Sequence, residues 1–188
     1  MIAKLFLILG GWLLVSNLVI DSPSSLQLSV ETSYRGISNY RNNKTFLNKS
    51  AMNELRKRLN FTQLRFHCSK QKGRTFHVAT VANSTGEAVV QYFSGQTDVM
   101  PQSCNSFVRM ENGNSEAAKV CKEWGAENGV VYNVSKWGPE VNEARLYHYV
   151  FIVWYKYHWL IYPDGGRLEC DDFNVTVSSG DFWKVFVR

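Results

Sequence analysis

The sequence predicts an α+β fold, rich in β-structure, in which an antiparallel sheet of about five to seven strands carries one or two short helices. Three observations lead to this expectation. Apolar and polar residues alternate over several short segments, turn residues separate these segments, and four cysteines offer disulfide staples. With 188 residues, 45% of them hydrophobic, the chain is long enough for a single domain with its own core.

The first residues have the layout of a secretory signal peptide. Lys4 precedes an uncharged apolar run from residue 5 to residue 20, and a polar, chain-breaking stretch follows. We expect residues 1–20 to be a signal peptide, cleaved somewhere between Ser16 and Ser25, and the protein to be secreted. An uncleaved membrane anchor is the alternative, because no small-x-small cleavage motif stands out.

Residues 21–50 are rich in Ser, Asn and Thr, which predicts an extended, glycosylated lead-in with at most one edge strand, at residues 26–30. Residues 51–188 are expected to form the single extracellular domain. Asn-X-Ser/Thr sequons are more frequent than chance explains, which supports this compartment. The sequon asparagines are Asn43, Asn48, Asn60, Asn83, Asn133 and Asn174. The alternative is that several of them are buried or unused, and Asn60, which precedes Phe61, is the first candidate for this.

The domain is expected to begin with a short helix at residues 50–61, where Leu55 and Leu59 repeat at helical spacing and Ser50 can cap. Alternation then predicts three strands of an antiparallel meander, at residues 63–68, 75–82 and 87–93. Residues 95–104 are expected to form a loop. Residues 115–124 predict a second helix, and residues 141–145 one more helical turn.

The stretch from residue 147 to residue 162 is the densest in aromatic side chains and predicts the spine of the core. At strand period one face is uncharged, and the other combines apolar residues with His148, Lys156 and His158. The stretch exceeds the usual strand length, so we expect a bulge or bend near residues 155–156. Residues 163–166 predict a tight turn to a strand at 167–173, and residues 182–187 predict the last strand.

All four cysteines follow the N-terminal segment, and their even number in an oxidising compartment predicts two disulfides. Three pairings are possible. We expect Cys104–Cys121 to close a loop onto a helix and Cys68–Cys170 to join two strands. No CxxC pair occurs, so the usual spacing of a zinc site is absent.

The net charge of +5 is mildly basic. Nucleic-acid binding proteins usually show a concentrated stripe of Lys and Arg. Here the basic residues 56–58, and further on Lys70, Lys72 and Arg74, fit a solvated helix face and a polar loop. We therefore expect no nucleic-acid partner, and a membrane only if the N-terminal segment is an uncleaved anchor.

Secretion signals, disulfides and an aromatic content of 14%, without a catalytic motif, predict a secreted, non-catalytic, N-glycosylated binding or recognition module for an extracellular protein or glycan. We expect the contacts to come from exposed aromatic side chains and from the acids around the hairpin at residues 163–166. The expected binding residues are Trp137, Trp154, Tyr162, Asp164, Asp171 and Asp172.

The alternative function is a small, basic, nuclease-like hydrolase that uses histidines and carboxylates. Its candidate catalytic residues are His67, His77 and His158, because histidine titrates near neutral pH. No cofactor is expected; the only candidate is Ca²⁺, for which loop carboxylates are suitable oxygen ligands. The candidate calcium ligands are Asp164, Glu169, Asp171 and Asp172.

Overall fold

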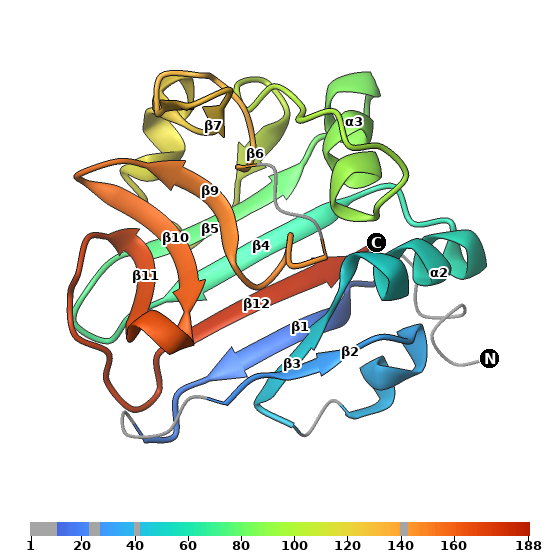
Figure 1. Cartoon of the computed structure of the whole chain (residues 1–188), viewed down its shortest axis with the longest axis horizontal. Coiled ribbons are helices and arrows are strands. Elements are labelled where there is room, and N and C mark those ends of the chain that lie inside the picture. The colour runs from blue at the N-terminus through green and yellow to red at the C-terminus, as the bar shows by residue number, and fades with distance from the viewer. Residues whose placement is uncertain (1–10, 23–26, 40–41, 140–142) are drawn as a thin grey trace.

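The computed structural model describes residues 11–22, 27–39, 42–139 and 143–188. A seven-stranded main sheet forms the base of the molecule, and a three-stranded sheet packs over one of its faces (Figure 1). The main sheet contains β1 (Leu13–Val19), β2 (Ser29–Glu31), β3 (Lys44–Leu47), β4 (Leu64–Ser69), β5 (Thr75–Thr80), β6 (Phe107–Arg109) and β12 (Phe182–Val187). The small sheet contains β9 (Tyr149–Val153), β10 (Tyr157–Tyr162) and β11 (Arg167–Asp172), and a separate ribbon contains β7 (Ala126–Glu127) and β8 (Val130–Val131). The helices are α2 (Lys49–Leu59) and α3 (Ser84–Phe93), with 3-10 turns η1 (Tyr34–Asn39), η2 (Ala117–Lys119), η3 (Cys121–Glu123) and η4 (Pro163–Gly165).

The predicted fold class is confirmed: the chain is rich in β-structure, with few helices and two disulfides. The main sheet has the order β2-β3-β1-β12-β4-β5-β6. Its strand pairs are antiparallel except β2–β3, so the sheet is mixed rather than purely antiparallel. The alternation in β4 is also confirmed, since Leu64, Phe66 and Cys68 are buried in the core.

The end of the expected signal peptide lies inside the main sheet. β1 pairs with β12 on one side and with β3 on the other, and Val15, Leu18 and Ile20 are buried. A central β-strand and a signal segment are both short apolar runs, so composition does not separate them. The position of this run at the N-terminus, after Lys4, is what suggests a signal segment. Residues 1–10 lie outside the described part of the chain, so the signal peptide stays a prediction. A cleavage after residue 20 would remove β1.

Residues 21–50 contribute more structure than the expected lead-in. β2 is the edge strand of the main sheet, close to the single strand expected at residues 26–30, but β3 is a second strand and η1 lies between them. Phe46 and Leu47 of β3 are buried in the core. This segment therefore folds together with the domain.

Two predictions of local structure are wrong. Residues 87–93 form the second half of α3 rather than a strand. The side chain of Asn83 accepts hydrogen bonds from the backbone N–H groups of Thr85 and Gly86 and so caps a helix, whose buried face includes Val89 and Phe93. Gly86 is required there, because a Cβ would lie 1.9 Å from the carbonyl oxygen of Val81.

Residues 115–124 form the two short turns η2 and η3 instead of one helix. The helix at residues 50–61, in contrast, is confirmed as α2, although Asn48 rather than Ser50 is its N-cap. Of the helical turn expected at residues 141–145, residues 141 and 142 lie outside the described part of the chain, and residues 143–147 form a turn.

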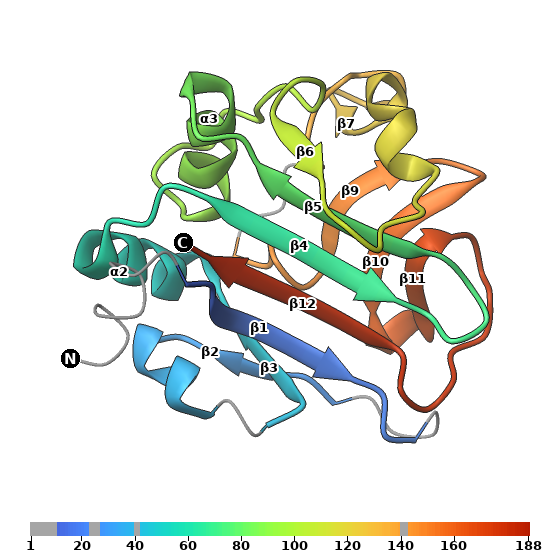
Figure 2. The same cartoon turned by 180° about the vertical axis from the view of Figure 1, so that it is seen from behind.

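The aromatic stretch reverses direction where a bend is expected. β9 ends at Val153, residues 154–156 form the turn, and β10 runs back antiparallel to β9. η4 then turns the chain into β11, so the hairpin expected around residues 163–166 is confirmed. Figure 2 shows this small sheet behind the main sheet, with the β9–β10 turn at one end of the molecule.

The core lies between the two sheets and is dominated by aromatic rings. Trp124, Trp137, Trp159 and Trp183 are all fully buried. The prediction that Trp137 is exposed is therefore wrong: its ring packs 5.1 Å from Phe66, and its Nε1–H donates to Ser106. Both predicted disulfides are confirmed, Cys68–Cys170 between β4 and β11 and Cys104–Cys121 between a loop and η3.

Candidate functional site

An open pocket of about 590 Å³ lies at the end of the molecule where the two sheets meet. Three segments line it: residues 72–74 of the β4–β5 turn, residues 155–156 of the β9–β10 turn, and residues 171–173 and 175 at and after the end of β11. The predicted residues Asp171 and Asp172 are among them. Trp154, 36% exposed, does not line the pocket but packs against Tyr155, which does.

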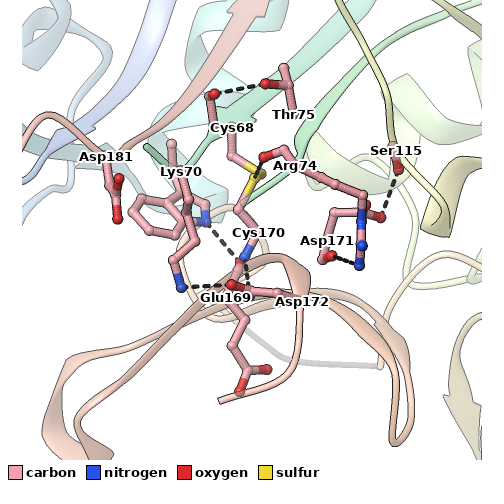
Figure 3. Close-up of a disulfide and its surroundings, with 12 residues drawn as sticks. Cys68, Lys70, Arg74, Thr75, Ser115, Glu169, Cys170, Asp171, Asp172 and Asp181 are labelled. Carbon is pink, nitrogen blue, oxygen red and sulfur yellow. Dashed lines mark hydrogen bonds and ion pairs between the residues drawn. A yellow bond between two sulfur atoms is a disulfide. The ribbon is translucent and has the colours of Figure 1, made fainter. Parts of the chain in front are cut away.

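The wall of the pocket is fixed to the core by the Cys68–Cys170 disulfide (Figure 3). Two residues beyond Cys68, the side chain of Lys70 is buried, and its Nζ lies 2.7 Å from a carboxylate oxygen of Asp172. The same Nζ donates to the backbone carbonyls of Leu168 and Val175 at 3.1 and 2.6 Å. Lys70 therefore contacts both β11 and the loop that follows it, and holds them against the end of β4.

Asp171 is the most heavily bonded carboxylate at the pocket. It is the extra residue of a β-bulge in β11, with a φ of 56°, which turns its side chain toward residues 115–117. Its oxygens accept hydrogen bonds from the Ser115 hydroxyl at 2.8 Å and from the N–H groups of Glu116 and Ala117 at 3.0 and 2.6 Å. Arg74 pairs with the same carboxylate (Figure 3). Asp171 therefore joins β11, the β4–β5 turn and η2.

Replacing Asp171 by alanine is expected to lower the free energy of unfolding by about 3 kcal/mol, because the Arg74 side chain and three donors lose their acceptor. Urea unfolding measures the change. Asp164→Ala is the matched control, since Asp164 is an exposed acid in the same hairpin and should change stability by no more than about 0.5 kcal/mol. Equal unfolding midpoints for the two variants would contradict this role of Asp171.

A second buried pair, His158 and Glu169, joins β10 to β11. The Nδ1–H of His158 donates to Glu169, whose other oxygen accepts from Arg167 at 2.7 Å and from the N–H of Asn174 at 2.9 Å. Burial acts to raise the pKa of Glu169, but hydrogen bonds from His158 and Arg167 outweigh it, so this pKa lies below its usual value. At Asp172 burial outweighs the attraction of Lys70, and its pKa is raised.

The expected calcium ligands do not form a joint site. Glu169, Asp171 and Asp172 each pair with a different basic side chain, and Asp164 is exposed on η4. Within the ranges that the structure describes, no three residues of the types His, Cys, Asp and Glu are grouped so that they could hold a metal ion. Glu169, Asp171 and Asp172 are thus engaged by basic side chains of the fold.

The three histidines proposed for hydrolysis lie at two separate places. His67 and His77 stack with their ring centroids 3.9 Å apart on the outer face of the main sheet. His158 is buried in the small sheet, with Phe173 packed edge-on at 5.3 Å. Its Nε2 is buried without a hydrogen-bond partner among the described residues. The structure thus brings His158 to a carboxylate, but not to the other two histidines.

The remaining predicted residues differ in accessibility. Tyr162 is half-buried beside His148, at the end of β10 that lies away from the pocket. Asn48 is a buried sequon asparagine whose side chain accepts from the N–H of Ala51, whereas Asn60 is exposed at the C-cap of α2 and is therefore not buried. The other sequon asparagines are half-buried or exposed: Asn43, Asn83, Asn133 and Asn174.

Sequence reasoning missed the basic and aromatic half of the pocket, namely Lys72, Arg74, Tyr155, Lys156 and Phe173. A signal was present in the sequence. The basic β4–β5 turn follows Cys68 and the acidic end of β11 adjoins Cys170, so the predicted disulfide already places these charges side by side.

No helix in the described ranges is long and apolar enough to cross a membrane. Comparison with known proteins finds no matching family model, no matching curated protein and no matching solved structure.

Proposed function

We propose that the protein is a secreted, N-glycosylated, non-catalytic binding module that recognises a glycan with an acidic group in the pocket at the β9–β10 turn. The observation that carries this proposal is Tyr155. Its side chain is 66% exposed at the rim of the pocket, although its backbone has a φ of 73°.

A tyrosine at positive φ is strained, and glycine or asparagine would occupy such a turn position at lower cost. Strained backbone positions cluster at ligand-binding sites. Because most of the Tyr155 side chain is in solvent, it contributes little to the core. A role in binding explains why a large aromatic ring stands at this position.

The rim offers flat apolar surfaces of the kind that pack against sugar rings. Trp154, Tyr155 and Phe173 are all exposed, while the large aromatic residues of the core are shielded from solvent. Aromatic rings desolvate readily and lose few rotamers on binding. A pyranose ring therefore fits this surface better than a highly charged, extended peptide.

The charges of the pocket favour an acidic group on that sugar. Lys72 and Lys156 are exposed, and neither forms an ion pair within the described ranges. The carboxylates of Asp171 and Asp172 are already paired with Arg74 and Lys70. The unpaired charged groups of the pocket are thus the two lysines, which can form charge-assisted hydrogen bonds with an anion.

The two disulfides support an oxidising, extracellular setting. The sequons point to the same compartment, and four of them have an exposed asparagine, which a glycan can reach.

Binding to an array of acidic and neutral glycans tests the proposal, and we expect acidic glycans to be retained selectively. For a retained glycan, calorimetry should show that Tyr155→Ala lowers the affinity about tenfold, which corresponds to 1.4 kcal/mol. Lys156→Gln should weaken binding in a salt-dependent way, because it removes one of the unpaired cations.

Tyr34→Ala is the matched control, since Tyr34 is an aromatic residue of η1, which packs against β3 and α2 and does not line the pocket. It should leave the affinity unchanged. If Tyr155→Ala and Tyr34→Ala bind the glycan equally well, the pocket is not the site.

A further inference from the structure

The outer face of the main sheet points away from the small sheet, and among the described residues Trp12 lies over its Arg65 end, 5.0 Å from the guanidinium. Figure 2 shows that no helix of the described ranges crosses β4 and β12 on this side. Strand register places Lys184 of β12 beside His67 of β4, and His67 beside His77 of β5. These three side chains therefore form one row across the strands.

Aromatic rings flank this row along β12. Phe182, Lys184 and Phe186 alternate with buried residues and lie on the same face, at intervals of about 6.7 Å along an extended strand. The guanidinium of Arg65 lies 3.8 Å from the ring centroid of Phe186, and Nζ of Lys184 lies 4.9 Å from that of Phe182. Cations and rings thus alternate over neighbouring strands.

The positive charge of this face is not neutralised. The strands β1, β4, β5 and β12 contain no Asp or Glu. Neither Arg65 nor Lys184 forms an ion pair with any carboxylate of the described ranges. The positive charges of Arg65 and Lys184 are therefore available to an anionic ligand.

The pKa of His67 reflects its burial first and the surrounding positive charge second. Burial and the neighbouring His77, Arg65 and Lys184 lower its pKa to about 4. The positive neighbours therefore act on this ring without a compensating anion.

We propose that this cationic sheet face binds a sulfated polysaccharide that lies across the strands. The residues that define the face are Arg65, His67, His77, Phe182, Lys184 and Phe186. Repeated sulfates complement the unpaired cations Arg65 and Lys184, and the phenyl rings offer apolar contact to the saccharide rings between them. Among polyanions, sulfated polysaccharide rather than nucleic acid fits a protein with two disulfides, which persist in oxidising, extracellular surroundings. The face is separate from the pocket, and the inference does not depend on the ligand proposed there.

The test uses heparin as the probe. A pH titration of the full chain, followed by NMR of the His67 ring protons, measures the pKa of His67 with and without heparin. Saturating heparin should raise the pKa of His67 by about one unit or more, because a sulfate within about 4–6 Å favours the charged imidazole. Lys184→Gln should lower heparin affinity and reduce its salt dependence, since one cation fewer is neutralised. Lys57→Gln, at an exposed lysine of α2, is the control with the same loss of charge.

An unchanged His67 titration in saturating heparin would overturn the proposal, even if heparin binds elsewhere on the protein. Equal heparin affinities for Lys184→Gln and Lys57→Gln would overturn it as well. Single-stranded DNA of similar length serves as a second polyanion. If it shifts His67 as strongly as heparin at the same salt concentration, the assignment to sulfated polysaccharide is wrong.

Discussion

A chain that begins at Asp21, and therefore lacks β1, is expected not to fold cooperatively. β1 fills the position between β3 and β12, and its loss leaves each of these strands without one of its two neighbours. Val15, Leu18 and Ile20 leave the core, at about 1.5–3 kcal/mol for each buried side chain. Their sum approaches the whole free energy of unfolding of an ordinary domain, which is about 5–15 kcal/mol.

Circular dichroism and urea unfolding of chains that begin at Gly11 and at Asp21 measure this effect. The longer chain should unfold in one cooperative transition, and the shorter chain should aggregate or unfold without one. A shorter chain with the same midpoint would show that β1 is dispensable. N-terminal sequencing of secreted protein then tells whether residues 13–19 are present in the mature form, as this role of β1 requires.

Removing the Cys68–Cys170 disulfide is expected to cost about 4.7 kcal/mol, the value that loop-closure entropy gives for a loop of about 100 residues. The two cysteines are 102 positions apart in the sequence, and both are fully buried. The bond also holds β11 against β4, so the wall of the pocket loses its attachment in the Cys68→Ala, Cys170→Ala double variant.

The second disulfide provides the matched control. Cys104 and Cys121 are 17 positions apart, for which the same entropy gives about 3 kcal/mol. In urea unfolding, the double variant at Cys104 and Cys121 should therefore lose less stability than the one at Cys68 and Cys170. A larger loss of stability in the Cys104 and Cys121 variant would contradict the view that loop length and the link between the two sheets determine how much each disulfide stabilises the fold.

Much of the fold follows from local patterns in the sequence. The alternation at residues 63–68 and 182–187 predicts β4 and β12, and the Pro-Asp-Gly-Gly turn predicts the β10–β11 hairpin. The pattern around Val89 and Phe93 fits a strand as well as a helix. There the side-chain cap of Asn83 and the close contact of Gly86 with the Val81 carbonyl select the helix. Neither can be recognised from the spacing of the apolar residues.

The site could be predicted only in part, because its key contacts join distant segments. The acidic end of β11 indicates the region, but the sequence does not show that Asp171 adopts positive φ in a bulge and turns toward Ser115. It also does not show that Lys70, in a polar turn, has a buried Nζ. Once these pairs are known, the carboxylates prove to be structural, and the unpaired lysines and Tyr155 become the candidates for binding.

The most direct test of glycan recognition at the pocket is backbone amide NMR during titration with glucuronic acid, and with glucose as the neutral counterpart. Binding at the pocket predicts concentration-dependent shifts at residues 72–74 and 155–156 with glucuronic acid, and much smaller shifts with glucose. Shifts confined to other surfaces, or equal shifts with both sugars, would contradict recognition of an acidic glycan by this pocket.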